Sequence, residues 1–134
     1  MHTIADTLTR IRNAQLRKAR YVLIPKTNMA KQLVMILSNE GFLEGVEELS
    51  QKTQKVSQHF LRVSLPEQSQ TTKAKPHVMK VVSRPGCRVY VNCKNIPTPR
   101  QNMSVCILST SKGLLTNKEA RLLGVGGEVL CTIW

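Results

Sequence analysis

The sequence predicts an α+β protein of two small domains. Helical periodicity is concentrated in the first forty residues and in one short stretch near the C-terminus, while most of the remainder consists of short apolar runs separated by turns. Residues 67–77 are rich in Gln, Thr and Lys without periodicity, which is typical of a linker or surface loop. We therefore expect an N-terminal α/β domain over residues 1–66, with two helices on a small sheet, and a mainly β domain with one short helix over residues 78–134.

The N-terminal domain is expected to open with a helix. Thr3 can cap this helix, and Asp6 lies in its first turn, where a carboxylate favours the partial positive charge of a helix N-terminus. Ile4, Leu8 and Ile11 follow at helical spacing and predict one buried face.

A short strand over residues 21–24 comes next and is closed by Pro25. Asn28 is then expected to cap a second helix, and Gly41 to end it, at a place that favours a left-handed residue. The apolar positions of this second helix are Met29, Leu33, Ile36 and Leu37.

Two β-hairpins are expected, one in each domain. In the first, residues 42–49 pair with residues 59–65, and the polar stretch between them forms the turn. In the second, residues 78–82 pair with residues 88–91. The turn Arg84–Cys87 between them fits type II, with Pro at its second position and Gly at its third.

The rest of the C-terminal domain encloses a segment rich in hydroxyl groups. A strand over residues 105–108 leads into Ser109-Thr110-Ser111-Lys112-Gly113, called the hydroxyl segment below, which we expect to be an exposed loop. Thr116 and Glu119 form the capping box of a short helix that Gly124 ends. Residues 128–134 read as a last strand.

Charge is the outlying property of this chain. The net charge is +12, from 20 Lys and Arg against 8 Asp and Glu. Residues 1–67 hold ten basic and six acidic side chains, and residues 68–134 hold ten and two, which gives +4 and +8. A domain this basic usually has a polyanionic partner, so we expect the C-terminal half to be the main anion-binding surface. The alternative is a surface that serves solubility.

The sequence offers little for catalysis, and we expect a protein that is not an enzyme. Asp6 is the only aspartate, and the three histidines are neither spaced as a metal pair nor beside an obvious nucleophile. The four cysteines contain no C-x-x-C pair, so we expect no metal, no cofactor and reduced thiols in an intracellular compartment. A Ser or Cys hydrolase stays open as an alternative, although no base lies beside a candidate nucleophile.

No membrane association is expected either. No apolar run approaches the roughly 18 residues that span a bilayer. The first fourteen residues carry Asp6, Arg10 and Arg12 without an apolar block, so we expect no signal peptide and a mature protein that begins here. The first helix has a narrow apolar face without aromatic anchors, which argues against peripheral membrane binding.

The hydroxyl segment is the strongest candidate for a binding site. Ser and Thr often precede helices because they cap free N–H groups. Thr116 already has that task, which leaves Ser109, Thr110 and Ser111 without an evident structural one. Three hydroxyls and Lys112 on a basic surface can bind phosphate, ribose and base edges. Small hydroxyl donors favour the wide, shallow minor groove of RNA over DNA.

Aromatic residues make up 4% of the chain, which is too few for a platform that stacks single-stranded bases, so structured RNA is favoured. Glu128 is an acid in a basic half, and two interpretations stay open. It can balance Arg88 or Arg121 at the surface, or it can accept a hydrogen bond from a base amino group and orient the hydroxyl segment. Arg12 and its basic neighbours in the first helix likewise fit either a phosphate contact or a solvated face.

Four stretches of this chain resemble the bacterial-type ribosomal protein S8 family of the small subunit. In order they are Ile4-Ala5-Asp6-Thr7-Leu8-Thr9-Arg10-Ile11-Arg12-Asn13-Ala14, Ser83-Arg84-Pro85-Gly86, the hydroxyl segment and Gly124-Val125-Gly126-Gly127-Glu128. The resemblance covers nearly the whole chain, and the combination is highly specific. It implies an N-terminal α/β domain, a mainly β C-terminal domain, no catalysis, and direct, early binding to small-subunit rRNA at a stem of the central domain.

The resemblance also implies the site. The hydroxyl segment would enter the RNA minor groove, with the strand around Tyr90 and with Glu128 nearby, while residues of the first domain touch neighbouring RNA. The partners would be small-subunit rRNA and neighbouring small-subunit ribosomal proteins, with no small-molecule substrate. The expected RNA-binding residues are Ser109, Thr110, Ser111, Lys112, Tyr90, Glu128, Arg84, Arg88, Thr3, Arg12 and Lys31.

Three segments depart from the family pattern. Residues 98–103 lack a Gly-Gly pair that is usual there, Thr116-Asn117-Lys118 replaces the usual Thr-Asp-Arg, and residues 66–77 differ from most members. The ending Gly-Gly-Glu-Val-Leu-Cys-Thr-Ile-Trp is similar to cyanobacterial and plastid members. We therefore expect a ribosome of the plastid stroma, with the bacterial cytoplasm as the alternative. A free regulator that represses a message by mimicking the rRNA site also stays open.

Overall fold

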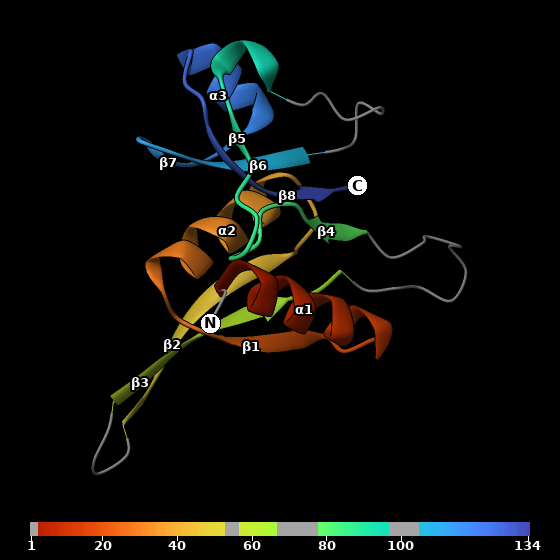
Figure 1. Cartoon of the computed structure of the whole chain (residues 1–134). Coiled ribbons are helices and arrows are strands. Elements are labelled where there is room, and N and C mark those ends of the chain that lie inside the picture. Colours follow the sequence, from red (N-terminus) through yellow and green to blue (C-terminus); the bar gives the residue numbers. More distant parts are fainter. Residues whose placement is uncertain (1–2, 53–56, 67–77, 97–104) are drawn as a thin grey trace. The chain divides into compact units, whose positions relative to one another are not determined.

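The computed structural model describes residues 3–52, 57–66, 78–96 and 105–134 (Figure 1). The chain divides into two compact units, Thr3–Pro76 and His77–Trp134. In the described residues, the first unit combines two helices with a three-stranded sheet, and the second is mostly strands with one α-helix. The predicted α+β class is confirmed.

The first unit is an antiparallel sheet with two helices. Its sheet has the order β1-β3-β2, so β3 is the central strand. Its buried hydrophobic residues come from both helices and from the sheet, where they include Ile24 of β1 and Leu61 and Val63 of β3. Its elements are α1 (Thr3–Leu16), β1 (Tyr21–Pro25), α2 (Asn28–Asn39), β2 (Gly45–Lys52) and β3 (Ser57–Ser64).

Helix α1 has the predicted buried face, because Ile4, Leu8 and Ile11 are all shielded from solvent. Thr3 already belongs to the helix in the described residues, so it is not a cap that precedes it. Asp6 lies in the first turn, as expected, and its carboxylate pairs with Arg10 one turn later at 3.1 Å.

The start of α2 differs from the prediction by one residue. Thr27, not Asn28, is the cap, because Thr27 has extended backbone and its hydroxyl accepts a hydrogen bond from the Ala30 N–H at 3.0 Å. Thr27 and Asn28 are both residue types that cap helices, and only the backbone conformation decides which of the two does so here. Met29 is exposed, and Ala30 and Val34 are buried beside the predicted Leu33, Ile36 and Leu37.

The end of α2 is as predicted. Gly41 has φ +86°, which places it in the left-handed region that follows many helices. The next residue, Phe42, donates its N–H to the Leu37 carbonyl at 2.9 Å, and Gly41 donates to Ser38 at 3.1 Å. These bonds satisfy carbonyl groups that a helix end leaves without partners.

The β2–β3 hairpin is longer than predicted and begins later. Strand β2 starts at Gly45, and residues 50–52 continue it where a turn was expected. On β3, residues 57–58 are also paired, and the residues between the strands lie outside the described part. Strand β1 pairs with β3 only as far as Phe60. The paired residues beyond it, Gln51, Lys52, Ser57 and Gln58, are all polar, so an alternating hydrophobic pattern gives no signal for a strand there.

The second unit is built around strand β8. Its sheet has the order β4-β8-β6-β7, and β5 also pairs with β8. Its elements are β4 (Met79–Val81), β5 (Tyr90–Val91), the short 3₁₀ helix η1 (Cys93–Asn95), β6 (Val105–Thr110), β7 (Gly113–Thr116), α3 (Asn117–Leu123) and β8 (Gly127–Ile133).

The predicted hairpin between residues 78–82 and 88–91 is wrong. Both segments pair with β8, one after the other: β4 with Cys131–Ile133 and β5 with Gly127–Glu128. The turn Arg84–Cys87 forms, with backbone hydrogen bonds of 3.1 and 2.9 Å between its ends. Gly86 does not have the positive φ that type II requires at its position, so the turn type was also predicted wrongly.

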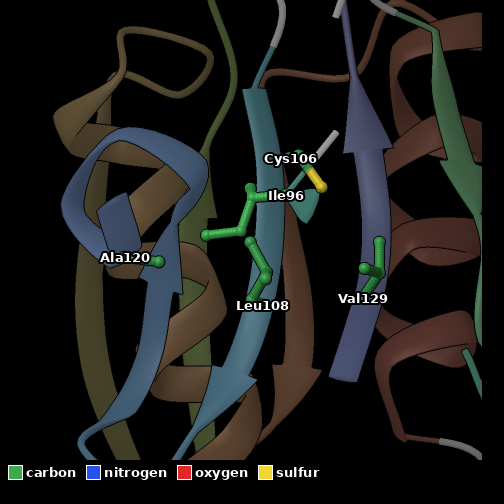
Figure 2. Packing of buried hydrophobic residues seen from close by; sticks show 5 residues of the cluster. All are labelled: Ile96, Cys106, Leu108, Ala120 and Val129. Atoms are coloured by element: carbon green, nitrogen blue, oxygen red, sulfur yellow. The ribbon is translucent and has the colours of Figure 1, made fainter. Parts of the chain in front are cut away.

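The core of the second unit lies between the sheet and α3. Cys106 and Leu108 of β6 and Val129 of β8 cluster with Ile96, after η1, and with Ala120 of α3 (Figure 2). Cys106 is fully buried in this cluster, and Cys131 of β8 is equally buried.

Helix α3 begins and ends where the sequence predicts. The Thr116 hydroxyl accepts a hydrogen bond from the Glu119 N–H at 3.3 Å, as a capping residue does. Gly124 has φ +68° at the other end, and Val125 donates its N–H to the Ala120 carbonyl at 3.1 Å. The capped helix thus separates β7, which ends at Thr116, from β8, which begins at Gly127.

Candidate nucleic-acid interface

The hydroxyl segment is a β-hairpin and not the expected loop. Strand β6 continues through Ser109 and Thr110, and β7 begins at Gly113, so Ser111 and Lys112 alone form the turn. Gly113 has φ +98° after two residues with negative φ, a pattern typical of a type I turn followed by a G1 bulge. Ser111 and Lys112 are therefore held at the exposed tip of a regular hairpin.

Thr110 has a structural task, contrary to the expectation. Its hydroxyl donates a hydrogen bond to the Gly113 carbonyl oxygen at 2.9 Å and accepts one from the Lys112 N–H at 3.2 Å. Both bonds close the turn. The Ser111 hydroxyl and the Lys112 ammonium have no such partner among the described residues, and both side chains are exposed.

Three of the expected site residues lie in one row across the sheet. Glu128 of β8 is directly opposite Tyr90 of β5 on one side and Ser109 of β6 on the other. Residues directly opposite each other on antiparallel strands have their side chains on the same face. Tyr90 is 70% exposed at one end of this row, which we call the recognition row (Tyr90, Glu128, Ser109). Two residues beyond Ser109, the hairpin tip begins.

Two glycines allow the three strands to approach closely at this row. A Cβ atom on Gly127 would collide with the backbone carbonyl of Ser109, and one on Gly126 would collide with the backbone at Val91 and Asn92. In the sequence these glycines are recognisable only as part of the stretch Gly124–Glu128 that carries the family resemblance. Their role depends on which strands flank β8, and this information is absent from the local pattern.

Glu128 is mostly buried and accepts two hydrogen bonds at one oxygen. Its Oε1 accepts from the Ser83 hydroxyl at 2.7 Å and from Arg88 Nη1 at 3.0 Å, and its side chain is 15% exposed. The expected balance between Glu128 and Arg88 is thus present. Arg121 donates to the Ile96 carbonyl at 2.9 Å.

Ser83 was given no role from the sequence. It is fully buried, and its hydroxyl oxygen also accepts the Val89 N–H at 3.1 Å. A role for Ser83 could have been expected from its position directly before the Arg-Pro-Gly turn. This turn brings residues 88 and 89 back beside Ser83.

The other expected residues are distributed over both units. In the second unit, Arg84 is exposed at the start of its turn. In the first unit, Thr3 is half-buried, while Arg12 on α1 and Lys31 on α2 are exposed. The Lys31 ammonium pairs with Glu48 at 2.7 Å.

Glu48 also pairs with Lys26 at 3.0 Å, so one carboxylate bridges two lysines. Hydrogen bonds from Lys31 and then Lys26 lower the pKa of Glu48 from 4.5 to about 2. An RNA phosphate that binds Lys31 would have to compete with this carboxylate.

Metal ligation and membrane insertion find no support in the described residues. Within them, no group of three or more His, Cys, Asp or Glu side chains is placed to hold a metal ion. None of the helices formed by these residues combines the length and the apolar character needed to cross a membrane.

The chain is similar to ribosomal proteins over nearly its whole length. The family model of Ribosomal protein S8 matches residues 2–134. Small ribosomal subunit protein uS8c of Ceratophyllum demersum is 44% identical over 132 residues, which cover 98% of this chain and 97% of that protein. The uS8c protein of Thalassiosira pseudonana is 44% identical over 98% of this chain and 96% of its own. Small ribosomal subunit protein uS8 of Rippkaea orientalis is 42% identical, again over 98% and 96%.

The two-unit α+β fold and these matches define a structural protein of the ribosome, a class that is not enzymatic. More narrowly, the chain belongs to the ribosomal protein S8 family, as its four motifs indicated.

Proposed function

We propose that this protein, as a component of the small (30S) ribosomal subunit, binds small-subunit (16S-type) rRNA directly at a stem of the central domain and thereby supports subunit assembly and translation. The observation that carries the proposal is the recognition row beside the exposed hairpin tip. Tyr90, Glu128 and Ser109 share one face of three adjacent strands, and Ser111 and Lys112 lie at the end of one of them. The half of the chain that contains them, residues 68–134, has a net charge of +8.

The chemistry of this surface divides into site choice and affinity. The hydroxyls of Ser109 and Ser111 and the exposed ring of Tyr90 suit ribose 2′-hydroxyls and base edges in a shallow minor groove. Lys112 and Arg84 supply charge for phosphates beside them, with an affinity that falls as salt rises. Thr110 contributes by fixing the hairpin tip.

The first unit adds a second, peripheral contact. Arg12 on α1 is exposed and suits a phosphate. Lys31 can bind a phosphate as well once that phosphate displaces Glu48 from its ammonium group. Thr3 lies in the first turn of the same helix as Arg12. Neighbouring small-subunit proteins are further partners. The plastid stroma is the compartment that this proposal includes, with the bacterial cytoplasm as the alternative, and its support is that the relatives include uS8c proteins and a cyanobacterial uS8.

The proposal is tested by binding of the purified chain to a central-domain rRNA fragment and to an unrelated stem, across a salt series. We expect tight binding to the first that survives moderate salt, and weak, salt-sensitive binding to the second. Equal, salt-sensitive binding to both RNAs would show only the non-specific attraction of a basic protein and would contradict the proposed site. Co-sedimentation with 30S particles separates a ribosomal component from a free regulator of a message.

A further inference from the structure

The Glu128 carboxylate lies at the centre of the recognition row, yet most of its surface is shielded from solvent. A buried carboxylate is costly unless donors surround it. Two donors reach its Oε1: the Ser83 hydroxyl at 2.7 Å and Arg88 Nη1 at 3.0 Å. Both come from the segment that leads into β5. The contacts therefore join the β5 segment to β8 at the level of the row.

Ser83 extends this connection to the backbone of the β5 segment. Its oxygen accepts the Val89 N–H at 3.1 Å, while the Val89 carbonyl accepts the Val129 N–H at 2.9 Å. Val89 is thus bonded on one side to Ser83 and on the other to β8. The next residue along the chain is Tyr90, so its place opposite Glu128 depends on these bonds.

Arg88 is more than a free cation on this surface. The Arg88 guanidinium and the Ser83 hydroxyl donate to the same oxygen, Oε1 of Glu128. The positive charge of Arg88 therefore lies beside the negative charge of Glu128. Two opposite charges at this distance nearly cancel for a more distant phosphate. The centre of the row is then electrically neutral, and net charge is left to Lys112 and Arg84 on either side.

We infer that Ser83 and Arg88 are positioning residues that clamp Glu128, and through it Tyr90, in the geometry that reads the RNA. The inference rests on the proposed function and deepens it, because it assigns sequence preference rather than general affinity to the clamp. Arg88 consequently acts on Glu128 and not on a phosphate. Removal of the clamp lowers preference for the cognate stem and leaves the electrostatic part of binding intact.

The experiment compares variants of the full chain on the central-domain fragment and on the unrelated stem, over the same salt series. Ser83→Ala and Arg88→Met are each expected to lower cognate affinity about tenfold, which corresponds to the loss of a hydrogen bond to a charged group. For Ser83→Ala, which changes no charge, affinity for the unrelated stem and the slope of affinity against salt should stay as in the unmodified chain. For Arg88 the same result is expected of the double variant Arg88→Met/Glu128→Gln, because it removes both charges of the ion pair and keeps the net charge. Lys112→Ala is the matched control, because loss of a phosphate contact weakens both RNAs alike and reduces the slope by about one.

A double-mutant cycle with Glu128→Gln separates the clamp from a general loss of packing. If Ser83 acts through Glu128, Ser83→Ala costs much less in the Glu128→Gln background than alone. Equal costs in both backgrounds overturn the assignment of Ser83. An Arg88→Met/Glu128→Gln variant that weakens both RNAs alike, as Lys112→Ala does, overturns the assignment of Arg88.

Thermal unfolding of each variant provides the folding control. If Ser83→Ala does not fold, Arg88→Met and Glu128→Gln decide the question alone, because the Arg88 side chain is about half exposed and its replacement leaves the core intact. An unmodified chain that shows no preference for the cognate stem overturns the proposed function itself, and this inference with it, before any variant is compared.

Discussion

Thr110 and Gly113 close the hairpin tip directly: the Thr110 hydroxyl donates to the Gly113 carbonyl oxygen at 2.9 Å, beneath the turn formed by Ser111 and Lys112. The hydroxyl segment therefore contains two kinds of hydroxyl group. Thr110 is occupied within the protein, and Ser111 is exposed without a protein partner among the described residues. Substitutions at these two positions should separate stability from recognition.

Thr110→Val should destabilise the protein, and Ser111→Ala should not. Loss of the Thr110 bonds is expected to lower the free energy of unfolding by about 1 kcal/mol, whereas Ser111→Ala should change it by less than about 0.5 kcal/mol. Urea unfolding measures both. In binding to the central-domain fragment, Ser111→Ala should cost about 1–2 kcal/mol. Unchanged binding of Ser111→Ala would remove the hairpin tip from the recognition surface.

Gly127→Ala should destabilise the second unit, because the added methyl group would meet the Ser109 backbone carbonyl. Forcing β8 away from β6 is expected to cost about 1–3 kcal/mol of unfolding free energy and to weaken cognate RNA binding, since it separates Glu128 from Ser109. Gly86→Ala is the matched control in the same unit. A Cβ atom on Gly86 meets nothing within 4 Å, and its φ is not positive. Similar unfolding midpoints for the two variants would contradict the close approach.

Glu48 should give the first unit a pH dependence in acid. Its pKa is lowered in the folded state to about 2 by Lys31 and Lys26, from 4.5. A carboxyl whose pKa falls on folding stabilises the protein above its unfolded pKa, and this stabilisation is lost as pH falls towards 2. The difference in unfolding free energy between the unmodified chain and Glu48→Gln should be constant above about pH 5 and vanish near pH 2.

The effect of Glu48 should be modest and reduced by salt, because its side chain is exposed to solvent. Glu47→Gln is the control: Glu47 is exposed on the same strand and has no ion pair among the described residues. A pH profile that is the same for both variants would show that the two lysines do not hold Glu48 in solution.

The four cysteines should differ in reactivity. Burial raises the pKa of Cys131 to about 12, with a further contribution from Cys106, and burial also raises the pKa of Cys106. Cys87 is exposed in its turn, and Cys93 is half-buried. Alkylation of the folded protein near neutral pH, followed by peptide mass spectrometry, should label Cys87 first, and should label Cys106 and Cys131 only under denaturing conditions. Labelling of Cys131 as fast as Cys87 would show that β8 opens readily.

Much of the local structure was predictable because its causes are local. The spacing of Ile4, Leu8 and Ile11 defines a helix face, and Gly41 and Gly124 each occupy a left-handed position that other residues adopt at a cost. Thr116 caps α3 with its own hydroxyl. In each case the determining contact lies within about four residues, so the sequence contains the relevant information. The order of four such motifs also indicated the family.

The candidate site was predictable as a set of residues but not as a surface. A period of two identifies a strand without naming its partner, and for this reason residues 88–91 were assigned to β4 when they pair with β8. That pairing places Tyr90 opposite Glu128, on the other side of β8 from Ser109.

By itself, the sequence determined the fold class, the end of α2 at Gly41, both ends of α3, the basic charge and the family. The tertiary structure decided which strands flank β8, why Gly126 and Gly127 are needed between them, and that buried Ser83 supports Glu128. The physical reason is the distance along the sequence over which each interaction acts. Capping and helical periodicity act between near neighbours. Strand partners such as Met79 and Ile133, and buried hydrogen bonds such as that from Ser83 to Glu128, join residues far apart in the sequence, and only folding of the whole unit selects them.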